Sequence, residues 1–138
     1  MNNKRNDITF RGRYLGVIVL AVVQYIVGII HISFGLIMLS GNFSMNSSLI
    51  TSTIYSLYTL VYGILTFVFT YLFWKGKRLG WIGTIMVSLF VILADTLTVL
   101  NLLSVLGIPK IAAIGEIPFS TLIIFYLLQN HVRSKYNP

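Results

Sequence analysis

Four long apolar segments fill most of this chain of 138 residues. They run over residues 14–39, 50–74, 79–106 and 108–129. A transmembrane helix needs about 20 mostly apolar residues to cross a hydrocarbon core about 30 Å thick. Only 9% of the residues are charged, whereas soluble domains carry about 25%. The sequence therefore predicts an all-α integral membrane protein, with residues 1–138 forming a single four-helix bundle of up-down topology.

The Lys and Arg residues are distributed unevenly around these segments. Nine of the ten precede the first segment, lie in the turn at residues 75–78, or follow the fourth segment; the tenth is Lys110. Under the positive-inside rule, this asymmetry predicts a multi-pass protein of the cell membrane with both termini in the cytoplasm. Trp74 and Trp81 flank the basic turn, and indole rings prefer the headgroup level, so both are expected to be interface anchors. Because the basic residues form short clusters between apolar segments, no nucleic-acid binding is predicted.

Small and polar residues recur along each segment at steps of three and four. This spacing places them on one face of a helix. In lipid, helices associate through small residues that allow close backbone approach and through interhelical hydrogen bonds, so these faces are expected to meet inside the bundle. The helix-packing positions predicted in this way are Gly28, Gly35, Gly63, Gly80, Thr84 and Ser88.

Asp95 and Glu116 are two of the three acidic residues, and both fall in or beside apolar stretches. An ionised carboxylate in hydrocarbon costs at least about 2.5 to 3.5 kcal/mol, so an acid in the membrane is normally paired, protonated or functional. Counting about 1.5 Å of rise per residue from the basic edges of the segments, four polar residues lie at similar depth. These residues, His31, Thr59, Asp95 and Glu116, form the candidate intramembrane polar site.

Two kinds of chemistry suit such a site. If Asp95 and Glu116 meet in a low dielectric, they cannot easily both ionise, so the pair would hold a proton that His31 could accept. A histidine with two carboxylates could also bind a divalent metal, but the three residues show no spacing motif. We therefore predict no metal and no cofactor. No catalytic set at an aqueous surface and no phosphate-binding glycine loop is present, so no enzyme activity is predicted.

A purely structural interpretation fits the same residues. Proline is tolerated in the first turn of a helix, so Pro118 allows the fourth helix to begin near Glu116. Glu116 would then be an acid stabilised by the dipole at a helix N-terminus. Asp95 would be satisfied by a hydrogen bond from Thr98 or Asn101. We favour this interpretation over both the proton-sharing pair and the metal site.

The polar loop at residues 42–53 contains two N-x-Ser sequons, at Asn42 and Asn46. The predicted topology places the start of this loop outside the cell. Glycosylation would require the loop to be on that side of the membrane. Such short patterns arise often by chance in loops rich in Asn and Ser. An unmodified flexible loop is therefore the alternative that we favour.

Three passages together resemble one kind of protein. They are residues 27–39, residues 62–81 with the turn WKGKRLGW, and the ending at residues 126–136. The combination resembles small four-span membrane proteins of unknown function from prokaryotes, often archaea. The resemblance implies a four-helix membrane fold and carries over no activity.

Two hypotheses of function follow. The first, which we favour from the sequence, is a non-enzymatic accessory or assembly component that acts through helix contacts within the bilayer, as a homo-oligomer or in a larger membrane complex. Little soluble chain is left through which it could bind anything else. The second is a small proton- or cation-coupled transporter or channel that uses Asp95 with His31 and Glu116.

Overall fold

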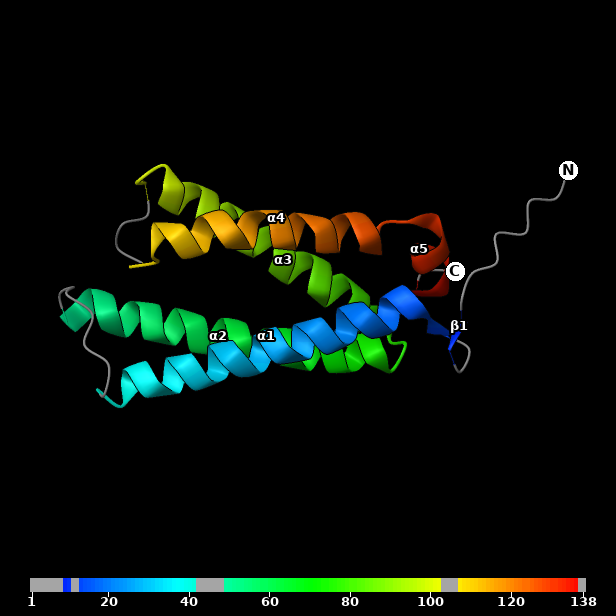
Figure 1. Cartoon of the computed structure of the whole chain (residues 1–138), viewed down its shortest axis with the longest axis horizontal. Helices are drawn as coiled ribbons and strands as arrows, with labels where there is room; N and C mark the ends of the chain where they lie inside the picture. Colours follow the sequence, from blue (N-terminus) through cyan, green and yellow to red (C-terminus); the bar gives the residue numbers. More distant parts are fainter. Residues whose placement is uncertain (1–8, 11–12, 42–48, 103–106, 137–138) are drawn as a thin grey trace, which may run out of the picture.

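The computed structural model describes residues 9–10, 13–41, 49–102 and 107–136 (Figure 1). Its elements in chain order are β1 (Thr9–Phe10), β2 (Arg13–Tyr14), α1 (Leu15–Leu39), α2 (Leu49–Trp74), α3 (Arg78–Val99), α4 (Lys110–Leu127) and α5 (Asn130–Tyr136). Within the described residues, four helices are long and apolar enough to cross a membrane. The predicted all-α architecture with four candidate spans is therefore confirmed. Both sequons, Asn42 and Asn46, lie outside the described residues.

The four long helices alternate in direction, as Figure 1 shows. In this view α1 and α2 lie below and α4 lies above, while α3 runs diagonally from the end of α2 and crosses α4 toward the upper left. The start of α1, the turn between α2 and α3, and the short helix α5 gather at one end of the bundle. We call this the basic end, because Lys75, Lys77, Arg78, Arg133 and Lys135 are exposed there.

Helix α3 ends at Val99, so the prediction that the third segment continues to residue 106 is wrong. Asn101 takes a left-handed backbone conformation, with φ of 60°. The N–H of Leu102 donates to the carbonyl of Leu97 at 2.8 Å, and the N–H of Asn101 donates to that of Thr98 at 3.0 Å. These bonds form a Schellman motif, in which asparagine can replace the usual glycine. Hydropathy alone does not detect such a stop.

Helix α4 begins at Lys110 and continues through Pro118. The interpretation in which it begins near Glu116 is therefore wrong. Proline removes one hydrogen bond from a helix, but an apolar surrounding offers the backbone no alternative partner, so the helix continues. The hydroxyl of Thr121, one turn later, donates to the carbonyl of Ile117 at 2.7 Å. Glu116 thus lies in the second turn of a continuous helix.

The small and polar faces of the four helices point into the bundle, as predicted. Buried residues on these faces include Ala21, Gln24, Gly28 and Gly35 on α1, Ser56, Thr59, Gly63, Thr66 and Thr70 on α2, Gly80, Thr84, Ser88, Val91, Asp95 and Thr98 on α3, and Ala113 and Ser120 on α4. Large apolar side chains such as Ile30, Phe90 and Phe125 are more than half exposed. This inside-out distribution is the one expected of a bundle surrounded by lipid.

Glycines set the close approach between neighbouring helices. A Cβ atom built on Gly63 of α2 would lie 2.8 Å from the backbone nitrogen of Ile32 on α1. One built on Gly35 would lie 2.9 Å from the Cβ of Leu60. At Gly80 of α3, a Cβ atom would collide with the backbone of Phe73 on α2. Larger side chains at these positions would force the helices apart.

An additional helix, α5, packs against the basic end. It was not predicted from the sequence. Val132 and Tyr136, four residues apart, are buried on one face of α5. The hydroxyl of Tyr136 donates to the carbonyl of Phe73 at 3.1 Å, and the two rings stack with centroids 4.9 Å apart. The Trp81 indole N–H donates to the carbonyl of Leu127 at 3.0 Å. Trp81 is thus packed inside the bundle end, whereas Trp74 is half-buried.

Candidate intramembrane polar site

Asp95 is a buried acid without a partner. It lies on the inward face of α3, with 0% of its surface exposed. Neither carboxylate oxygen has a hydrogen-bond partner in the described part of the chain. The expectation that Thr98 or Asn101 satisfies it is wrong, because the Thr98 hydroxyl donates to the carbonyl of Ala94 at 2.9 Å and Asn101 is exposed beyond the helix. A polar group buried without a partner costs about 1 to 3 kcal/mol, and a charged one costs more.

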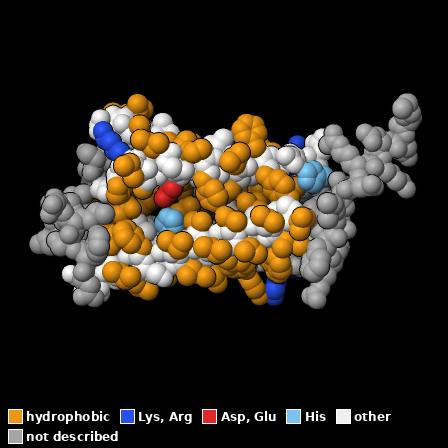
Figure 2. Space-filling model, in the orientation of Figure 1, with side chains coloured by type: hydrophobic (Ala, Val, Ile, Leu, Met, Phe, Trp, Pro, Cys, Tyr) orange, Lys and Arg blue, Asp and Glu red, His pale blue; other side chains and the backbone are white. Residues whose placement is uncertain are grey.

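His31 and Glu116 form a pair between α1 and α4. Nε2 of His31 lies 3.4 Å from Oε1 of Glu116, and the side chains are 20% and 29% exposed. In Figure 2, acidic and histidine side chains lie side by side on the face shown, surrounded by hydrophobic side chains. The pair therefore sits at the seam between α1 and α4, in contact with the surroundings of the bundle.

The hydrogen bonds of His31 fix how many protons this pair shares. Nδ1 of His31 lies 2.8 Å from the carbonyl of Val27, so Nδ1 must carry a hydrogen in order to donate to it. Nε2 then carries a hydrogen only in the imidazolium form. A bond between Nε2 and Oε1 accordingly holds a single proton, either on His31 facing a carboxylate or on Glu116 facing a neutral ring. Both arrangements are neutral overall, so the pair leaves the charge of Asp95 uncompensated.

Asp95 lies close enough to interact electrostatically with both members of the pair. In the described residues, however, no three His, Cys, Asp or Glu side chains form a group that could hold a metal ion. Thr59 is buried and hydrogen-bonds with Tyr55 on its own helix. The structure thus brings His31 and Glu116 into direct contact, and it leaves Asp95 near them but separate.

The sequence analysis missed two tyrosines that belong to this site. Tyr62 packs edge-on against the ring of His31, with centroids 4.7 Å apart. Tyr58 interacts electrostatically with Asp95, and its buried hydroxyl has no hydrogen-bond partner within the described chain. Tyr55, Tyr58 and Tyr62 follow the helical spacing of three and four in the second segment. This spacing could have identified the tyrosines as part of the site, because tyrosines in the middle of a span do not act as interface anchors.

A column of polar side chains begins near the basic end and reaches Ser88, about two turns before Asp95, with the buried Val91 between them. At its start, the hydroxyl of Thr70 donates to Oε1 of Gln24 at 3.2 Å, which links α2 to α1. A small void of about 10 Å³ follows, with Thr66, Thr84 and Ser88 among its lining residues. A void of this size holds about one water molecule. The hydroxyl of Thr66 interacts with that of Tyr62 but makes no hydrogen bond of ordinary geometry in the described residues, which suits such a water.

No protein-family model, no curated protein and no solved structure matches this chain. The chemistry of the site therefore rests on its own geometry. An unpaired buried carboxyl can take up a proton or a cation, and a shared-proton pair nearby can relay one.

Proposed function

We propose that this protein is a small membrane transporter or channel that binds a proton or a cation at Asp95. The observation that carries the proposal is the complete burial of Asp95 without a hydrogen-bond partner in the described chain. An ionisable residue inside a membrane bundle is costly, and it commonly marks an ion or proton pathway. A role in structure alone would be expected to provide the carboxyl with donors, as the neighbouring threonines have acceptors.

Two further features support this function. The polar column from Gln24 to Ser88 lies between the basic end and Asp95, and a single water in its void would connect the hydroxyl groups. The pair of His31 and Glu116 lies at the seam between α1 and α4 and interacts electrostatically with Asp95. A proton could therefore pass between the pair and Asp95, with the polar column as the route toward the basic end.

An orientation in the membrane belongs to the same proposal. The basic end carries most of the basic residues, so we place it and both termini in the cytoplasm of a cell-membrane protein. Lys77 and Lys110 are exposed at opposite ends of the bundle and allow a matched test, since the chain has no cysteine. In intact cells, a membrane-impermeant maleimide is expected to label a Lys110→Cys variant and to spare Lys77→Cys. Labelling of Lys77→Cys alone would reverse the orientation.

The transport function predicts a specific loss in reconstituted vesicles. Wild-type protein should carry a proton flux, read by a pH-sensitive dye inside the vesicles, under an imposed membrane potential. Asp95→Asn keeps the size of the side chain and removes its ionisation, so the flux should fall to the level of protein-free vesicles. Asp95→Glu keeps a carboxyl group and should retain part of the proton flux.

Asp7→Asn is the matched control, because the sequence places Asp7 before the first span. It should leave the flux unchanged. A flux that survives Asp95→Asn at the wild-type level, or wild-type vesicles without any proton or cation flux, would refute the transport function.

The partly exposed pair of His31 and Glu116 favours a second candidate function, an accessory or assembly component. A polar pair in contact with hydrocarbon is unfavourable, and a neighbouring helix at the seam would cover it. In mild detergent, wild-type protein should then retain a stoichiometric partner or second copy, and Glu116→Gln should release it. A monodisperse monomer without any co-purifying protein would contradict this candidate.

A further inference from the structure

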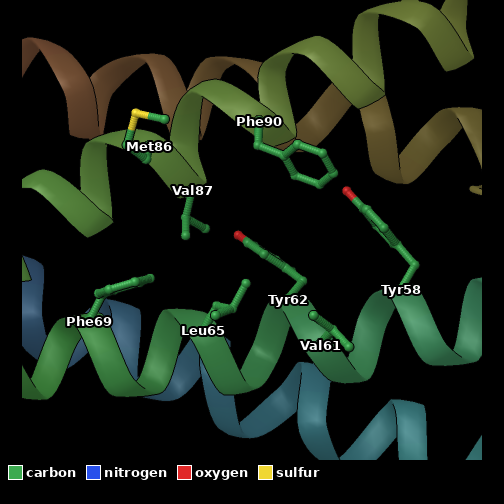
Figure 3. A pocket seen from close by; sticks show the side chains of 8 residues that line it. All are labelled: Tyr58, Val61, Tyr62, Leu65, Phe69, Met86, Val87 and Phe90. Carbon is green, nitrogen blue, oxygen red and sulfur yellow. The ribbon is translucent and has the colours of Figure 1, made fainter.

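A laterally open groove lies between α2 and α3 (Figure 3). Its volume is 400 Å³, within the range of about 300 to 1,000 Å³ that is usual for small-molecule sites. The lining side chains are Tyr58, Val61, Tyr62, Leu65 and Phe69 from α2, and Met86, Val87 and Phe90 from α3. In Figure 3, the rings of Tyr58 and Tyr62 extend from α2 toward α3. The groove is therefore an apolar space with two phenol rings inside it.

Aromatic rings form much of the wall of this groove. Tyr58 and Tyr62 are nearly parallel, with ring centroids 6.5 Å apart and planes at 16°. Phe90 approaches Tyr58 from α3, with centroids 6.3 Å apart. Ring faces attract cations, and the attraction grows when the site is removed from water. Such a wall favours a bulky organic cation over an anion of the same shape.

An acidic side chain, which has the matching sign, interacts with one residue of this wall, although it does not line the groove itself. Asp95 is the single Asp, Glu, Lys, Arg or His residue in the stretches 49–74 and 79–99. It interacts electrostatically with Tyr58, which lines the groove. In a low dielectric, charges act over longer distances than in water. Since the pair of His31 and Glu116 is neutral overall, a cation in the groove would face a net negative centre.

The depth of the groove restricts what can enter it. Tyr62 lies 12 residues before Trp74, and Phe90 lies 12 residues after Arg78, or about 18 Å from the basic ends of the two helices. Both therefore lie near the middle of a hydrocarbon core about 30 Å thick. Val61, Met86 and Phe90 are all more than half exposed at the outer side of the groove. A ligand must accordingly reach the groove through the bilayer, and must dissolve there.

We propose that the groove between α2 and α3 binds a lipophilic organic cation, with its apolar groups among the aromatic side chains and its charge directed toward Asp95. This inference names the cation class for Asp95 and so rests on the proposed function. Binding and release of a proton at Asp95 would compete with the organic cation. The protein would then couple the two.

The test uses two probes of nearly equal shape and opposite charge, tetraphenylphosphonium and tetraphenylborate. Binding of each to the full-length protein in detergent is measured by equilibrium dialysis. Wild-type protein should bind the phosphonium about tenfold or more tightly than the borate, after subtraction of binding to empty micelles. Equal binding of the two probes, or tighter binding of the borate, would overturn the proposal. This comparison needs no variant and so does not depend on folding of a mutant.

Variants locate the site. Asp95→Asn removes the negative charge but keeps the aromatic wall, so it should reduce the preference for the phosphonium by weakening phosphonium binding, and it should not weaken binding of the borate. Phe90→Leu removes a ring from the groove wall and should weaken phosphonium binding about three- to tenfold. Phe125→Leu is the matched control, because Phe125 lines the separate groove between α1 and α4. A charge preference that Asp95→Asn leaves undiminished, or a loss seen with Phe125→Leu instead of Phe90→Leu, would refute the assignment.

The outcome is separable from that of the proposed function. A proton flux that depends on Asp95, together with equal binding of the two probes, would refute the organic cation and retain the transport function. Phosphonium binding that depends on Asp95, without any flux, would retain the groove as a binding site and refute transport.

Discussion

Hydrocarbon offers no hydrogen-bond partner, and this constraint organises the whole bundle. Polar side chains must face inward and find partners within the protein. Thr84, Thr98 and Thr121 do so locally, each donating to a carbonyl four residues earlier. Thr70 and Trp81 do so across helices. The glycines complete the arrangement, because close backbone approach at Gly63 and Gly80 brings the inward faces together.

A few buried polar side chains in the described part of the chain nevertheless lack a hydrogen-bond partner. Among the described residues, the buried side-chain atoms without a hydrogen bond belong to Tyr58, Thr66 and Asp95. All three lie on α2 or α3. Thr66 borders the small void, Tyr58 borders the groove, and Asp95 interacts electrostatically with Tyr58. Thr66 is thus an exception among the buried threonines, and the three open groups are where a proton, a water or a cation could bind, which is the basis of the proposed function.

Much of the fold could be predicted, because the bilayer constrains local features of the sequence. Span length and the spacing of small residues predicted the four long helices and their inward faces, including the burial of Asp95. The end of α3 could not be predicted, because a single left-handed residue, Asn101, stops the helix inside an apolar run. Pro118 suggested a helix start near Glu116 that the structure does not have, since a helix in lipid keeps its remaining hydrogen bonds and continues. The contact of His31 with Glu116 and the separation of Asp95 depend on side-chain packing between distant segments, which spacing does not encode.

The central claim is that Asp95 gains and loses a proton inside the bundle. Infrared difference spectroscopy of the protein in lipid, recorded between low and high pH, reads the carbonyl stretch of a carboxylic acid directly. The account predicts a band that appears at low pH in wild-type protein, is absent from Asp95→Asn and persists in Glu116→Gln. A spectrum in which Asp95→Asn removes no carboxyl band, while Glu116→Gln removes all of it, would contradict the claim.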